Sequence, residues 1–122
     1  FVGQVPYATM VNMLRISAVH VYLTVPFVLS WSMLEAMSLG CCVVGSSTPP
    51  VQEVITHGQN GLLVDFFDPQ AIASQVCEVL ARPQDYQDMR RAARAHVVQH
   101  YDYQTVCLPR HHHIITGHAM GA

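Results

Sequence analysis

A single ionisable acid, Glu35, stands in an otherwise uncharged stretch, residues 27–47 (FVLSWSMLEAMSLGCCVVGSS). It lies in a predicted helix, about residues 32–39, that follows a predicted strand. The opening amides of this helix, near residues 30–33, lie at the positive end of the helix dipole, where an anion such as a diphosphate can bind. One turn further on, the Glu35 carboxylate can accept hydrogen bonds from hydroxyls of the same ligand, such as those of a ribose.

The same residues also have a purely structural interpretation. Ser32 and Glu35 have the spacing of a capping box, in which Ser32 accepts from the third helical amide and Glu35 reaches back to the Ser32 amide. Such boxes are common and indicate no catalysis. An acid buried in an apolar helix is costly unless it has partners. Both interpretations therefore stay open on the local pattern.

Strands and helices are predicted to alternate along the chain. Short runs of β-branched and other apolar residues indicate buried strands, and apolar residues at three- and four-residue spacing indicate helices. The predicted strands are the segments 1–2, 18–25, 41–45 and 62–66. The predicted helical segments begin after Pro6, near residue 32, at residue 51, after Asp68 and near residue 84, and the last of them ends near residue 100.

Strands that alternate with helices form a parallel sheet through right-handed crossovers. We therefore expect an α/β fold, a Rossmann-like parallel sheet with flanking helices. Residues 1–122 would form a single partial domain, with a less regular tail over residues 102–122. Ligands bind at the carboxyl ends of strands in such sheets, which here are residues 26–35, 45–50 and 65–68.

The composition argues against several classes of function. The 122 residues carry a formal net charge of -2, contain no lysine and give no basic footprint for nucleic acid. The four cysteines have neither disulfide-framework nor C-x-x-C spacing, so we expect buried thiols in a reducing compartment, by default the cytoplasm. No apolar run is long enough to cross a membrane, and the first residues do not resemble a signal peptide.

Histidines and arginines are expected to have structural or incidental roles. His20, in the second predicted strand, is interpreted as a core histidine. Residues 111–113 are consecutive histidines that cannot all face one ion, so any metal binding there would be adventitious. Arg90, Arg91 and Arg94 are interpreted as a solvated helix face, with contact to anionic lipid or to another domain as the alternative.

Five segments in order resemble the donor-binding half of family 4 retaining glycosyltransferases, enzymes with two facing Rossmann-like domains (the GT-B fold). They are an acid-Ala-Met-x-x-Gly stretch, an apolar strand, a Glu-Val/Ile-Ile turn, an Asn-Gly-Leu-Leu-Val strand and a helix after Asp. In this chain they fall at residues 35–40, 42–44, 53–55, 60–64 and 68–69. Each segment is weak alone, but five at the family's spacing are a strong signal.

The resemblance implies a donor-binding role for the matched positions. Glu35 corresponds to the second acid of the family's Glu-x7-Glu motif, which binds the ribose of a nucleotide sugar such as a UDP- or GDP-sugar. The backbone of Leu29, Ser30, Trp31 and Ser32 would hold the donor diphosphate. In the family this chemistry proceeds without a metal cofactor.

Other positions depart from the family pattern or are less well defined. Phe27 occupies the position of the first acid of the motif, and because a phenyl ring cannot accept hydrogen bonds, the catalytic residue stays unknown. Thr48 and Pro49 form a stiff loop that would border the sugar site. Glu53 either caps its turn or anchors it near the donor pocket.

The resemblance also implies what the full-length protein does. It would be a hexosyltransferase that moves a sugar with retention to a glycan or lipid-linked acceptor held by an N-terminal domain. Bacterial polysaccharide synthesis at the inner face of the membrane is the expected setting. A sugar-nucleotide epimerase of similar fold and a non-catalytic α/β binding module are the alternatives.

The first residues, Phe1 and Val2, resemble the end of a strand, which indicates a piece of a longer protein. The Arg and Lys pair with which the family holds donor phosphates is not in this chain. We therefore expect the piece to be inactive alone. We also expect it to self-associate through an exposed sheet edge.

Overall fold

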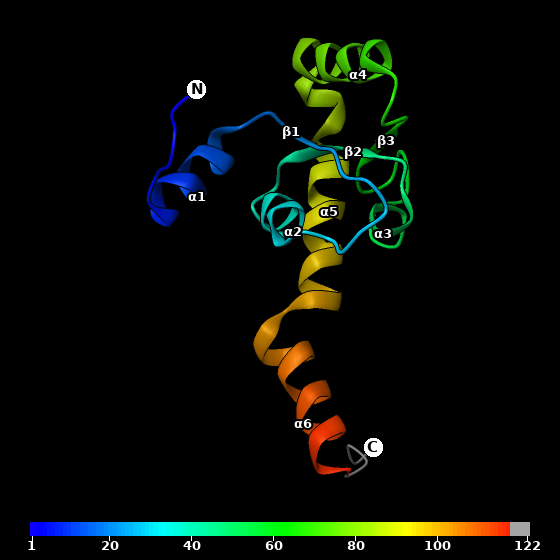
Figure 1. Cartoon of the computed structure of the whole chain (residues 1–122). Coiled ribbons are helices and arrows are strands. Elements are labelled where there is room, and N and C mark those ends of the chain that lie inside the picture. Colours follow the sequence, from blue (N-terminus) through cyan, green and yellow to red (C-terminus); the bar gives the residue numbers. More distant parts are fainter. Residues whose placement is uncertain (118–122) are drawn as a thin grey trace.

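The computed structural model describes residues 1–117 and contains a parallel sheet with the strand order β1-β2-β3 (Figure 1). The strands are β1 (Val19–Tyr22), β2 (Cys42–Ser46) and β3 (Leu62–Val64). Helix α2 (Trp31–Ser38) connects β1 to β2, and the short helix α3 (Pro49–Gln52) lies between β2 and β3. The expected α/β fold, a parallel sheet with flanking helices, is confirmed.

Strand β2 is the centre of the sheet and is buried along its whole length. Successive side chains of a strand point to opposite faces. Val43 accordingly packs in one core cluster with Met33 and Met37 of α2, whereas Val44 packs in a second cluster with Val79 of α4 (Pro69–Ala81). Burial on both faces explains the unbroken apolar run of this strand in the sequence.

Strand β1 is shorter and less buried than predicted. It covers four residues instead of segment 18–25, and Val21 is 41% exposed. The cause is its position at the sheet edge, since among the described residues only β2 pairs with it. His20 is partly buried, and this burial lowers its pKa. Residues 1–2 form no strand, because a strand needs a pairing partner and none of the described residues provides one.

Helix α1 (Tyr7–Ile16) begins directly after Pro6, as predicted, and stands apart from the sheet, on the side of α2 (Figure 1). It contains no buried residue. Its attachment to the rest of the fold includes a hydrogen bond from the Cys41 thiol to the carbonyl oxygen of Leu14, at 2.9 Å. Helix α1 is therefore held at the surface of the fold and contributes little to the core.

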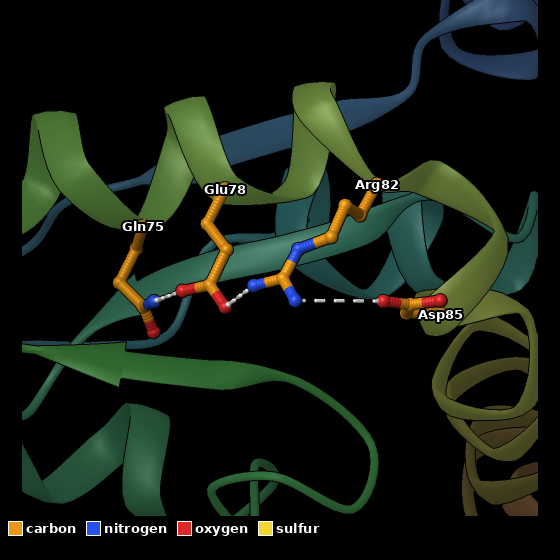
Figure 2. Close-up of polar contacts among 4 residues, drawn as sticks. All are labelled: Gln75, Glu78, Arg82 and Asp85. Carbon is orange, nitrogen blue, oxygen red and sulfur yellow. Dashed lines mark hydrogen bonds and ion pairs between the residues drawn. The ribbon is translucent and has the colours of Figure 1, made fainter.

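Helix α4 begins and ends with side-chain contacts. The Asp68 carboxylate accepts a hydrogen bond from the Ala71 amide at 2.9 Å, which confirms the predicted N-cap. At the other end Arg82 pairs with Glu78 at 2.5 Å and lies 3.9 Å from Asp85, in the first turn of the next segment (Figure 2). Because these side chains are exposed, the ion pairs orient the connection more than they stabilise it.

A long helical segment follows, and its first turn differs from the prediction. A turn of 3-10 helix, η1 (Pro83–Tyr86), precedes α5 (Gln87–Tyr101) where one helix over 84–100 is predicted. The predicted buried side is confirmed, since Ala93 and Val97 are buried in one core cluster and Met89 packs on the other. Helix α5 therefore contacts both core clusters.

The chain continues beyond α5 as a π-helical turn, η2 (Tyr103–Cys107), and α6 (Leu108–Thr116), which extends away from the sheet (Figure 1). Asp102 accepts hydrogen bonds from the amide and hydroxyl of Thr105, and these bonds lower its pKa. Helix α6 has no buried residue. No helix within residues 1–117 is long and apolar enough to cross a bilayer.

Candidate functional site

The N-cap of α2 lies two residues before the one that the predicted capping box requires. The helix begins at Trp31, and its N-cap is Ser30, whose hydroxyl accepts a hydrogen bond from the Ser32 amide at 3.3 Å. The Ser32 hydroxyl lies 3.1 Å from that of Ser30. Ser32 is therefore inside the helix, and the capping-box interpretation of Glu35 is wrong. The Glu35 side chain is left available for other partners.

Removing this cap gives a first testable prediction. Ser30→Ala takes away the acceptor for the Ser32 amide, so we expect the free energy of unfolding to fall by about 1 kcal/mol. Ser74→Ala, at an exposed position inside α4, is the matched control, because alanine is the better helix former there. Urea unfolding followed by circular dichroism measures both variants. Equal stabilities of the two variants would contradict the assigned cap.

The Glu35 carboxylate has a partner from another helix. The hydroxyl of Tyr7, the first residue of α1, donates a hydrogen bond to Glu35 Oε1 at 2.9 Å. This hydrogen bond, followed by the charge of Glu35, raises the pKa of Tyr7. The two helices are thus joined at the acid that the sequence singles out, and Glu35 lies partly exposed at the surface.

A hollow of about 480 Å³ lies beside Glu35, between α2 and the C-terminal helical segments. One side of the hollow is lined by a face of α2, which consists of Trp31, Leu34, Glu35 and Ser38. The other lining residues come from α5, η2 and α6, and they are Val97, Tyr101, Tyr103, Cys107 and His111. Aromatic rings next to one carboxylate can stack on a planar or sugar ring while the acid accepts hydrogen bonds from hydroxyl groups.

The backbone amides predicted to hold a diphosphate are only partly available. The Ser30 amide donates to the Tyr22 hydroxyl at 2.9 Å, and the Ser32 amide donates to its cap. Within residues 1–117, the Trp31 amide has no hydrogen-bond acceptor. An anion at this helix end would therefore meet the Trp31 amide directly and would compete with Ser30 for the Ser32 amide.

The opposite end of α2 is covered by two arginines of α5. Arg90 donates to the carbonyl oxygen of Gly40 at 2.5 Å, and Arg94 donates to that of Ser38. Arg91 instead pairs with Asp88 on its own helix. Arg91 and Arg94 are exposed, as predicted, whereas Arg90 is partly buried. Arg90 and Arg94 also satisfy carbonyl groups at the negative end of the helix, which is not predicted. The sequence gives no signal for these contacts, because the partners are distant along the chain.

The three residues predicted to border a sugar site lie around α3. Thr48 is the N-cap residue of α3 and is buried, and the Thr48 hydroxyl lies 3.4 Å from the Ser46 hydroxyl. Pro49 is its first residue, and Glu53 is its exposed C-cap residue. Thr48 lines a hollow of about 500 Å³ that differs from the one beside Glu35. The structure does not bring these residues to the same hollow as Glu35.

The hollow at Thr48 has a largely aromatic and polar lining. Its walls come from the β1–α2 loop, the β2–α3 loop, β3 and the segment after it. The lining residues are Pro26, Ser47, Thr48, Leu63, Asp65, Phe66 and Phe67. These segments include the predicted ligand-binding ends of the strands. Phe27 lies in the first of these loops with 76% of its side chain exposed, and it lines neither hollow.

The thiols and imidazoles of residues 1–117 form no metal centre. Cys41 and Cys42 are buried, as predicted, and burial raises the pKa of Cys42 to about 11, so its thiol stays protonated at neutral pH. The prediction is wrong for Cys77, which is exposed on α4, and for Cys107, which is only partly buried. Within residues 1–117 no group of three His, Cys, Asp or Glu residues could hold a metal ion.

Comparison with known proteins assigns the chain to a family. A sequence model described as "Glycosyl transferases group 1" matches residues 1–96. The chain belongs to the group 1 glycosyl transferases. Over 69 residues this glycosyl transferase domain is 30% identical to the N-acetyl-alpha-D-glucosaminyl L-malate synthase of Bacillus anthracis. That match covers 57% of the chain and 18% of the relative.

Solved structures show the same fold. HepE of Anabaena, in complex with UDP, matches 86% of this glycosyl transferase domain with a TM-score of 0.77 at 21% identity. Sucrose-phosphate synthase from Thermosynechococcus elongatus matches 97% of it with a TM-score of 0.81 at 22% identity. The chain covers 29% and 30% of these two proteins. It therefore corresponds to less than a third of a whole enzyme of this kind.

Proposed function

We propose that the whole protein transfers a sugar from a nucleotide-sugar donor and that the first turn of α2, with Glu35, forms part of the donor site. The observation that carries this proposal is the position of Glu35 in a group 1 glycosyl transferase domain. Glu35 is partly exposed, lies one turn into a helix and is beside an aromatic hollow. The Trp31 amide would hold the diphosphate together with the backbone of Leu29. The Ser30 and Ser32 amides would join them by exchanging the Tyr22 and Ser30 hydroxyls for the phosphate. Glu35 would accept hydrogen bonds from the ribose hydroxyls.

A UDP- or GDP-sugar is the proposed donor. Support comes from HepE of Anabaena, whose structures hold UDP and UDP-glucose and whose fold matches this domain. Thr48, Pro49 and Glu53 would border the transferred sugar, on the side of the hollow at Thr48. The helix dipole of α2 would stabilise the leaving diphosphate without a metal ion, as preorganised dipoles do in other transfer enzymes.

The acceptor and the setting are proposed from the family. The sugar would pass with retention to a glycan or lipid-linked acceptor that binds outside residues 1–122. A bacterial, cytoplasmic enzyme of polysaccharide synthesis, in peripheral contact with the inner face of the membrane, fits this role. The 122-residue chain alone would be inactive, because it spans less than a third of the length of the similar structures.

Incubation of the intact protein with UDP-, GDP- and ADP-sugars, with and without EDTA, tests this function. We expect release of one nucleoside diphosphate that depends on an added glycan or lipid-linked acceptor and persists with EDTA. Conversion of the donor to an epimer without nucleotide release would instead identify a sugar-nucleotide epimerase. No turnover and no nucleotide binding would identify a non-catalytic module, the alternative that Phe27 at the first-acid position favours.

Self-association of the 122-residue chain is a further prediction. The outer side of β1 is unpaired among the described residues, and Val21, Leu23 and Val25 are exposed there and in the following loop. Such an apolar strand edge favours pairing with another chain. We expect concentration-dependent oligomers in analytical ultracentrifugation and a shift to monomer with Val21→Lys. A monomer at all concentrations would contradict the prediction.

A further inference from the structure

We infer that Tyr7 is a positioning residue of the donor site that holds the Glu35 carboxylate for the ribose. This inference rests on the proposed function of Glu35. Its basis is the 2.9 Å hydrogen bond from the Tyr7 hydroxyl to Glu35 Oε1. Among residues 1–117, no other side chain donates a hydrogen bond to this carboxylate. The two residues come from different helices, so the contact fixes the acid relative to α1 as well as to α2.

The contact leaves the carboxylate able to bind a ligand. An ionised carboxylate has two oxygens with about four acceptor positions, and a phenol hydroxyl occupies one of them. Oε2 is left for one ribose hydroxyl and the second position on Oε1 for the other. The Tyr7 oxygen also keeps lone pairs that can accept a hydrogen bond. Tyrosine and a vicinal diol can therefore bind Glu35 together.

Packing in the core does not explain a tyrosine at position 7. Its side chain is 65% exposed, and α1 contains no buried residue. The hydrogen bond to Glu35, and then the charge of Glu35, raise the pKa of Tyr7 above its ordinary value of 10.0. A phenol is protonated and can donate throughout the neutral range, and the raised pKa extends this range upward, so alkali breaks the contact as the pH rises through that raised pKa.

Titration of the intact protein with UDP, using Tyr7→Phe, tests the inference. We expect about fivefold weaker binding with an unchanged melting temperature, because the variant keeps the ring and loses one hydrogen bond to a charged group. Tyr86→Phe is the matched control. Tyr86 also lies near a glutamate, Glu78, but it packs on the core cluster that contains Val44 and Val79 of β2 and α4. The Tyr86→Phe variant should therefore bind UDP as tightly as the wild type.

A double-mutant cycle separates positioning from an independent contact. In the Glu35→Gln background, Tyr7→Phe should have little further effect, because its action passes through the carboxylate. Unchanged or tighter UDP binding by Tyr7→Phe alone, or fully additive losses in the double variant, would overturn the role of Tyr7 while leaving that of Glu35 intact. Undiminished binding by Glu35→Gln would overturn the proposed ribose contact and this inference with it.

Discussion

Glu35→Gln should weaken the binding of UDP to the intact protein by about tenfold, because a charged acceptor for ribose hydroxyls becomes a neutral amide. The substitution keeps the shape of the side chain. Glu35 is partly exposed and forms no ion pair within residues 1–117, so the fold should be unaffected. Isothermal titration calorimetry measures the affinity, and thermal unfolding checks the fold.

The nucleotide itself provides the sharpest control for this prediction. With 2′,3′-dideoxy-UDP, which lacks the hydroxyls that Glu35 would bind, the wild type and Glu35→Gln should have equal affinities. Glu78→Gln, in the exposed network on α4 (Figure 2), should leave the affinity for UDP unchanged. An equal loss for UDP and the dideoxy analogue would show that Glu35 acts through charge or structure and does not bind the ribose.

Met37→Ala should produce the largest loss of stability, about 2–5 kcal/mol, because it opens a cavity in the core between α2 and the sheet. Met37 has no exposed surface and packs with Val43 of β2 and Val97 of α5. Helix α2 depends on this contact for its position. The variant should therefore also weaken UDP binding, since the helix that carries Glu35 loses its packing.

Met13→Ala is the matched control, because Met13 is 41% exposed on α1. The free energy of unfolding of the Met13→Ala variant should differ from that of the wild type by less than about 0.5 kcal/mol, as is usual for a surface position. Denaturant unfolding of both variants measures the difference. Equal stabilities would mean that α2 is not packed on the sheet as described.

Features encoded by neighbouring residues could be predicted from the sequence. The Asp68 cap is one residue before Pro69, and Gly40, with φ of 77°, ends α2 where a left-handed residue is needed. The apolar run of β2 indicates a strand buried on both faces, and it is one. Glu35 could be singled out because it is the one charge in its stretch.

Features that join distant residues could not be predicted from the sequence. Tyr7 has the spacing of an apolar helix stripe, and nothing local indicates a hydrogen bond to an acid 28 residues later. The contacts of Arg90 and Arg94 with the end of α2 span 50 and 56 residues. The apolar run of residues 18–25 predicts a strand buried on both faces, but β1 is partly exposed because it lies at the edge of the sheet, which no local pattern indicates.

The capping box shows how a two-residue shift of the N-cap, from Ser32 to Ser30, changes an interpretation. Ser30 and Ser32 are both good N-cap residues, and only the start of the helix at Trp31 decides between them. With Ser30 as the cap, Glu35 is the fifth residue of α2 and cannot form the box. The structure thereby removes the main structural explanation for this acid and replaces it with the contact to Tyr7.

A crystal structure of the intact protein with UDP would show directly whether Glu35 binds the ribose. We expect the diphosphate within hydrogen-bond distance of the Trp31 amide, and both ribose hydroxyls on the Glu35 carboxylate with Tyr7 still bound to Oε1. UDP bound with its ribose away from Glu35, for example in the hollow at Thr48, would show that Glu35 is not the ribose-binding acid.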